Sequence, residues 1–222
     1  MPLDSFGVPI ELRWPCLESV RAAPTVANAL ISPRGYHSQL GEDKLLFEYF
    51  FNAPEWRCRA NRSATPHPRC KSHPPTYLEL GANDGLKMSN TVFYEETLGW
   101  QGLLVEAVPK YCDRIVNHRC GGNQNVVACG AVCKPTDGGS VELLLMEAMS
   151  GSPSMGLYES HIHNKREDNP EWQRRVNVPC APLSALLARA GLWQRRIDLF
   201  SLDVEGAELQ VPVASYRPCL PL

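Results

Sequence analysis

Short apolar runs alternate with segments of helical periodicity between residues 76 and 204, and this alternation constrains the fold more than any other feature. Four runs have the length and composition of buried strands: 77–80, 103–106, 125–132 and 197–204. Helices are predicted at 89–98, 109–118 and 183–190. Strands that alternate with helices form a mostly parallel sheet flanked by helices, so the sequence predicts an α/β fold.

Three further segments surround this alternation. A helix is predicted from a cap at Ser38 to about Phe51, because apolar residues recur there at helical spacing. The apolar run at 141–146 predicts an extra hairpin strand, and the polar residues 147–176 predict an irregular segment.

Prolines mark the ends of the predicted domain. The chain has 19 prolines in 222 residues, which is above the usual share of about 5%. We expect an irregular Pro-rich arm at 1–35, a domain at 36–210 that contains a basic Pro-rich loop at 53–75, and a Pro-rich tail at 211–222. Prolines in this tail exclude a further helix, so we expect the C-terminal strands of the sheet to be missing. The last strand would then have an exposed edge, open to a partner chain.

Charge and hydropathy exclude several classes of function. A formal net charge of -2 gives no basic field for nucleic acid. No apolar run approaches the ~18 residues that span a bilayer, and the first thirty residues lack a secretory signal core. The chain as written is therefore expected to be soluble and cytoplasmic.

Nine cysteines leave the compartment open. None forms a C-x-x-C pair, so no structural zinc site is predicted. Cys58 and Cys70 flank the glycosylation sequon Asn61-Arg62-Ser63, which also fits a disulfide-closed loop of the secretory pathway.

The strongest chemical signal is the turn after the first strand, Glu79-Leu80-Gly81-Ala82-Asn83-Asp84-Gly85. Gly81 permits a tight turn, and Gly85 permits the backbone to approach a ligand closely. The spacing differs from the G-x-G-x-x-G of dinucleotide sites, and the terminal carboxylate of the strand suits a cationic ligand such as S-adenosylmethionine. Glu106 ends the next strand, where an α/β nucleotide site places an acid to accept the ribose hydroxyls.

Three side chains are candidates for the base that takes a proton from an acceptor hydroxyl. Asp203 comes at the end of a buried strand, beside the predicted pocket. His161 and His163 lie in the irregular segment, where solvated loop histidines are equally expected. Glu208 fits the first turn of a following helix, and no metal site is predicted, because the carboxylates lack a full ligand set.

Four ordered blocks of the chain resemble the FkbM-type S-adenosylmethionine-dependent methyltransferases. They are Ser38–Asp43, Glu79–Thr91, Leu98–Glu106 and Ile197–Glu208. The resemblance spans 36–210 and implies a Rossmann-like class I methyltransferase sheet. It implies that Glu106 binds the ribose, that Asp203 lies at the pocket floor, and that the methionine end of the cofactor is lined by Glu79, Gly81, Ala82, Asn83 and Gly85.

The resemblance implies O-methylation of a hydroxylated small molecule or a sugar, with no nucleic acid as partner. Two alternatives stay open within the family: a non-catalytic binding or trafficking module, and an inactive truncated form. A dinucleotide-binding enzyme is a further alternative, against which the missing G-x-G-x-x-G argues.

Overall fold

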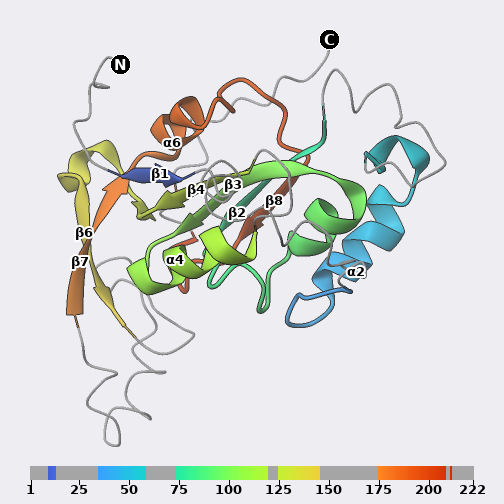
Figure 1. Cartoon of the computed structure of the whole chain (residues 1–222). Helices are drawn as coiled ribbons and strands as arrows, with labels where there is room; N and C mark the ends of the chain where they lie inside the picture. The colour runs from blue at the N-terminus through green and yellow to red at the C-terminus, as the bar shows by residue number, and fades with distance from the viewer. Residues whose placement is uncertain are drawn as a thin grey trace, which may run out of the picture.

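A five-stranded sheet forms the centre of the molecule (Figure 1). The computed structural model describes residues 10–13, 35–58, 74–119, 125–145, 175–208 and 211. The strands of this main sheet are β1 (Glu11–Arg13), β2 (Thr76–Leu80), β3 (Gln101–Glu106), β4 (Val126–Cys129) and β8 (Leu199–Leu202). Their order is β1-β4-β3-β2-β8, and β1 alone runs antiparallel to its neighbour. The α/β architecture predicted from the alternating pattern is confirmed.

The direction in which strands are added reverses between β2 and β8. From β2 the chain adds β3 and then β4 on one side, whereas β8 pairs with the other side of β2. In open α/β sheets, ligands bind at such a switch point, beyond the carboxyl ends of the strands. The topology therefore directs attention to the turns that follow β2 and β8.

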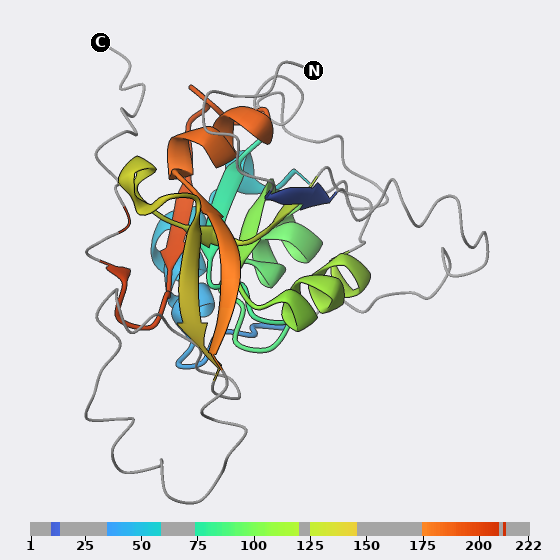
Figure 2. The ribbon, with the colours of Figure 1, turned by 90° about the vertical axis from the view of Figure 1, so that its left-hand side faces the viewer.

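Both faces of the main sheet are covered, which explains why its strands are continuous apolar runs. On one face, Leu78 and Leu103 pack with α6 (Leu183–Arg189). On the other, Tyr77 and Leu104 pack with α4 (Pro109–His118) and with the π-helical turn η3 (Tyr94–Leu98). Figures 1 and 2 show α4 and α6 on opposite sides of the sheet. Pro109 opens α4 as predicted.

A second, three-stranded sheet stands beside the first (Figure 2). It has the order β5-β7-β6 and consists of β5 (Ala131–Val132), β6 (Ser140–Leu144) and β7 (Arg175–Ala181). The single strand predicted at 125–132 is therefore wrong: it breaks at Gly130 into β4 and β5, which belong to different sheets. A Cβ at Gly130 would lie 2.7 Å from the Pro179 carbonyl oxygen, so only glycine allows this close crossing.

The helix predicted from Ser38 starts later than expected. The helix α2 (Glu42–Leu46) follows Gly41 and continues as the π-helical turn η1 (Phe47–Phe51), and a short 3-10 turn η2 (Pro54–Trp56) comes next. Gly41, in a left-handed conformation, occupies the N-cap position. Ser38 nevertheless accepts the Asp43 N–H and donates its hydroxyl to the Asp43 carboxylate at 2.6 Å. This local contact between Ser38 and Asp43 thus takes the place of the expected N-cap.

Residues 11–13 lie within the arm predicted to be irregular, yet they form β1, an edge strand of the main sheet that pairs with β4. A three-residue strand is too short to show alternation in the sequence. The opposite edge of the main sheet is β8, and the partner chain expected there remains a proposal. No helix among the described ranges is long and apolar enough to cross a membrane.

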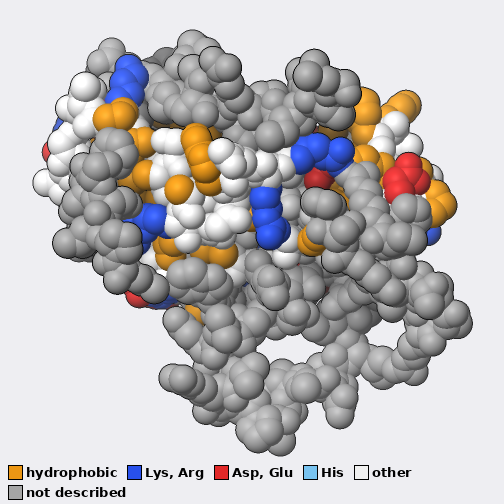
Figure 3. All heavy atoms as spheres, turned by 90° about the horizontal axis from the view of Figure 1, so that it is seen from above, with side chains coloured by type: hydrophobic (Ala, Val, Ile, Leu, Met, Phe, Trp, Pro, Cys, Tyr) orange, Lys and Arg blue, Asp and Glu red, His pale blue; other side chains and the backbone are white. Residues whose placement is uncertain are grey.

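Four apolar side chains of the segment 40–50 are exposed rather than packed. Their exposed fractions run from 57% to 86%, for Leu45, Phe50, Tyr49 and Leu40. In the view from above, hydrophobic side chains gather at the right-hand edge (Figure 3), which is the end of the molecule where Figure 1 places α2. This end of the molecule lies away from the β6–β7 side (Figure 1).

Candidate functional site

A cavity opens beyond the carboxyl ends of the parallel strands, at the switch point. It is lined by residues that follow β2, β3, β4 and β8 and by side chains of β6. Its empty space is about 1010 Å³ with the open solvent at its mouth included. Of the seven residues predicted to bind a cofactor, five line this cavity: Gly81, Ala82, Asn83, Glu106 and Asp203.

Gly81 sits where the turn after β2 meets the segment after β8. Its φ is +81°, and a Cβ at this position would lie 1.7 Å from the Asp203 carbonyl oxygen. The Gly81 N–H donates to the Val105 carbonyl at 2.9 Å. The predicted tight turn is present, and it requires glycine because the backbone at Asp203 occupies the space of a side chain.

Gly85 does not line the cavity. A Cβ there would lie 3.1 to 3.2 Å from Arg119 and Ile115. The close approach that this glycine permits is therefore to the end of α4, in contrast to the expected approach to a ligand.

Glu106 faces the cavity from the end of β3 with its carboxylate held by the backbone. One oxygen accepts the Asn83 N–H at 2.8 Å, and the other accepts the Val108 N–H at 2.7 Å. Burial raises the pKa of Glu106 to about 7, although the two backbone donors lower it in part. Each carboxylate oxygen has a further lone pair, so Glu106 retains the capacity to accept hydroxyl groups of a ligand.

Glu79 belongs to a different environment from Glu106. Because side chains alternate along a strand, Glu79 points to the α4 face of the sheet, together with Tyr77. It does not line the cavity. Its carboxylate accepts the Thr91 hydroxyl at 2.6 Å, the Ser89 hydroxyl at 3.0 Å and the Asn90 N–H at 2.8 Å. Contact of Glu79 with a cofactor stays a prediction, and the contacts that it makes here hold the turn after β2.

The sequence predicts a helix that starts at Ser89, with Asn90 and Thr91 as its next residues. Ser89 accepts the N–H groups of Thr91 and Val92, as predicted for a cap. The Asn90 side chain donates to the Ser201 hydroxyl at 2.9 Å. These residues therefore join the turn to β8 and to the helical residues that follow.

Carboxylates line the cavity at its β8 end. Asp203 is exposed at the mouth of the cavity, and Glu205 is partly buried there. Burial raises the pKa of each, and the neighbouring Glu208 raises it further. Glu208 itself accepts the N–H groups of Val204 and Gly206, so it closes the turn after β8. Within the described residues no group of three or more ligating side chains is arranged to hold a metal ion.

Several cavity residues were not predicted from the sequence. Tyr111 of α4, Lys87 of the turn, and Val141 and Leu143 of β6 line the cavity. The β6 residues belong to the predicted extra strand, but its position over the switch point depends on pairing with β7. His161 and His163, the other candidate bases, lie outside the described residues.

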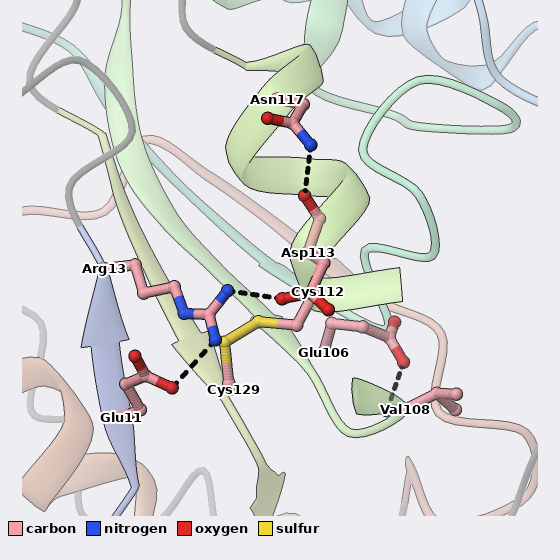
Figure 4. The surroundings of a disulfide bond; sticks show 8 residues. All are labelled: Glu11, Arg13, Glu106, Val108, Cys112, Asp113, Asn117 and Cys129. Carbon is pink, nitrogen blue, oxygen red and sulfur yellow. Dashed lines mark hydrogen bonds and ion pairs between the residues drawn. A yellow bond between two sulfur atoms is a disulfide. The ribbon is translucent and has the colours of Figure 1, made fainter. Parts of the chain in front are cut away.

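A disulfide lies behind Glu106 (Figure 4). It joins Cys112 of α4 to Cys129 of β4, and Cys129 is paired in register with Glu106. The bond therefore ties the helix that follows Glu106 to the strand beside it. Figure 4 also shows Arg13 of β1 between Glu11 and Asp113, which fixes the edge strand to α4.

A second disulfide joins Cys133 to Cys180 and fixes the segment after β5 to β7. Cys58, at one end of the loop that also fits closure by a disulfide, is disulfide-bonded as well. Cys70 and the sequon lie outside the described residues.

Comparison with known proteins gives a family. The family model described as the methyltransferase FkbM domain matches residues 79–211. No curated protein and no solved structure gives a match. The matched range contains the turn after β2, Glu106 and Asp203, and thus most of the cavity. With more than half of its length matched, the chain belongs to the FkbM methyltransferase family.

Proposed function

We propose that the chain binds S-adenosylmethionine at the switch point and methylates an oxygen of a hydroxylated small molecule or glycan. The family is shown by the match at 79–211. The observation that supports a cofactor with a ribose is Glu106, a buried carboxylate at the end of β3 that faces the cavity, and the missing G-x-G-x-x-G favours S-adenosylmethionine over a dinucleotide. A carboxylate in this position suits the two hydroxyls of a ribose.

The chemistry of the cavity fits this cofactor at both ends. Ala107, Val108 and Val132 give an apolar wall next to Glu106, which suits a flat aromatic base. Asp203 and Glu205 bring negative charge to the β8 end, which suits an ammonium and a sulfonium group.

Bound in the cavity, the cofactor would supply an electrophilic methyl group. The chain's own residues would hold the acceptor in line with that methyl group and exclude water, which supplies much of the rate in such displacements. For the acceptor oxygen to take up that methyl group, the proton of its hydroxyl would have to pass to a base of the chain. Asp203 is the candidate base, because burial raises the pKa of its carboxyl and so increases its affinity for a proton.

Titration calorimetry with S-adenosylhomocysteine, and separately with NAD, tests the choice of cofactor. We expect a one-to-one complex with S-adenosylhomocysteine and weaker binding of NAD. Tighter binding of NAD would refute the proposal and favour the dinucleotide-binding alternative. A radiolabelled methyl-transfer assay over a panel of sugars and hydroxylated small molecules then separates an enzyme from a binding module, because the module binds cofactor without turnover.

We further propose that the chain folds in an oxidising compartment. Cys112–Cys129 and Cys133–Cys180 both lie next to cavity residues, and structural disulfides persist where glutathione does not reduce them. Alkylation of free thiols before mass spectrometry, on protein taken from its natural source, tests this. Disulfide-linked peptides are expected, and full alkylation of these four cysteines would contradict the proposal.

A further inference from the structure

Arg119 lies at the C-terminal end of α4 and is fully buried. A guanidinium has five N–H donors, and five hydrogen bonds use them all. Nε donates to the Glu95 carboxylate at 2.6 Å. Nη1 donates to the Gly85 carbonyl at 2.9 Å and to the Ser89 hydroxyl at 3.1 Å. Nη2 donates to the Thr91 hydroxyl at 2.9 Å and to the Tyr77 hydroxyl at 3.0 Å.

Three of these five acceptors belong to residues 81–91, which we call the turn segment. Gly85, Ser89 and Thr91 are spaced along it, so the guanidinium holds the segment at several points. The other two acceptors lie on β2 and η3, which are buried parts of the core. Arg119 thus joins the turn segment to the core through residues that do not line the cavity.

The charge of Arg119 is preserved in this buried position. Burial alone lowers the pKa of the guanidinium, but the Glu95 and Glu79 carboxylates raise it above its usual value. The Glu79 carboxylate lies 3.8 Å from Nη1 and accepts hydroxyl groups of the same two residues, Ser89 and Thr91. Each of these side chains bonds to at least one other member of the network, which favours a rigid arrangement.

The cavity side of the turn segment needs such support. Asn83 adopts a left-handed conformation with φ of +51°, and its N–H donates to Glu106. A non-glycine residue in this region costs free energy and persists only where the surrounding structure holds it. Lys87 and Met88, further along the segment, also line the cavity.

We infer that Arg119 is a positioning residue, which fixes the turn segment so that Asn83 and Lys87 keep their places at the cavity. It touches no lining group directly and acts through Gly85, Ser89 and Thr91. The inference that this arrangement serves cofactor binding depends on the proposed function, whereas the effect of Arg119 on the turn segment does not.

Replacement by lysine is the sharpest test, because lysine keeps the charge but has three donors at one point instead of a planar fork of five. In Arg119→Lys we expect the amides of residues 82–88 to exchange with solvent at least about tenfold faster than in the wild type, while those of β3 and β4 keep their protection. We expect the affinity for S-adenosylhomocysteine to fall about tenfold.

Arg189→Lys is the matched control. Arg189 donates to the Ile10 carbonyl at 2.6 Å on the α6 side of the sheet, and neither residue lines the cavity. This variant makes the same substitution at an exposed arginine whose guanidinium donates to a backbone carbonyl. It should lower the melting temperature without changing exchange at 82–88 or the affinity for the ligand.

A second pair of variants keeps the test decisive if Arg119→Lys fails to fold. The Thr91 hydroxyl accepts from Arg119 and donates to Glu79, and the Tyr77 hydroxyl accepts from Arg119 and donates to Glu95 at 2.8 Å. Thr91→Val and Tyr77→Phe therefore each remove one bond to the guanidinium and one to a carboxylate. Only Thr91→Val should speed exchange at 82–88, because only Thr91 belongs to the turn segment.

Equal exchange at 82–88 in the wild type and Arg119→Lys, or equal effects of Thr91→Val and Tyr77→Phe on that exchange, would overturn the inference. If the wild type fails to bind S-adenosylhomocysteine, the proposed function fails, and the exchange measurements still decide the role of Arg119.

Discussion

Replacing Glu106 by glutamine should remove a pH dependence of cofactor binding that the wild-type chain shows near neutral pH. Both oxygens of the Glu106 carboxylate accept backbone N–H groups, and burial raises its pKa to about 7. Ribose hydroxyls donate best to the ionised form. Affinity for S-adenosylhomocysteine should therefore rise with pH as Glu106 ionises.

The size of this effect follows from the pKa. With a value of about 7, the ionised fraction rises from about one tenth at about pH 6 to about nine tenths at about pH 8, so affinity should rise about tenfold. At the higher pH, Glu106→Gln should bind about 10- to 150-fold more weakly than the wild type, because it loses charge-assisted hydrogen bonds of about 1.5–3 kcal/mol.

The same pKa makes a prediction for the free protein. Since the pKa of about 7 in the folded chain lies above the ordinary value of 4.5, the stability that protonated Glu106 contributes is complete below about pH 4.5. It is lost as the pH rises through about 7, and the full loss is about 3 kcal/mol. Binding of the ligand should offset part of this loss.

Titration calorimetry at about pH 6, 7 and 8 measures both variants, with Glu142→Gln as control. Glu142 is an exposed carboxylate of β6 that pairs with Arg175, and its removal should leave the pH profile unchanged. Our reasoning is refuted if wild-type affinity is constant across this range, or if Glu106→Gln keeps the wild-type profile.

Two further changes test the construction of the site. Gly81→Ala should destabilise the fold by about 2–6 kcal/mol, because its Cβ would lie 1.7 Å from the Asp203 carbonyl oxygen at a φ of +81°; a thermal melt should show a fall of about 5–20 °C. Gly138→Ala, at a φ of +70° with open space around it, is the control, and an equal fall there would argue against the contact at Asp203. Joint replacement of Cys112 and Cys129 by alanine should lower the melting temperature by about 6–12 °C, since a crosslink over 17 residues contributes about 3 kcal/mol. A wild-type melt unchanged by reducing agent would contradict this.

The sequence predicts those strands and helices whose position is set by apolar runs and by prolines along the chain. Apolar runs located β2, β3 and β8, and Pro109 located the start of α4. The cavity was predictable too, because parallel strands bring their carboxyl ends to one edge of the sheet. Gly81, Glu106 and Asp203 follow three such strands and meet there.

The second sheet was beyond this reasoning for a physical reason. Pro179 lies within β7, the central strand of that sheet, and proline in a sequence argues against a central strand. Gly130 breaks the predicted strand in two, and the reason for a glycine there is its close contact with Pro179, which is far away in the sequence. Pairing between segments far apart in the chain, rather than local propensity, fixed these elements.

The turn after β2 shows how a motif can be recognised correctly while its residues have other roles than expected. Its acid and its last glycine face away from the cavity: Glu79 accepts bonds from Ser89 and Thr91, and Gly85 lies against Arg119. An arginine after a helix normally suggests a solvated cation, so no sequence pattern indicates that Arg119 lies at the centre of this network. The same logic applies to Glu79→Gln, which should weaken ligand binding through the shape of the turn segment rather than through a lost contact. Faster exchange at 82–88 accompanying that weaker binding would distinguish the two, because loss of a direct contact leaves exchange in the free protein unchanged.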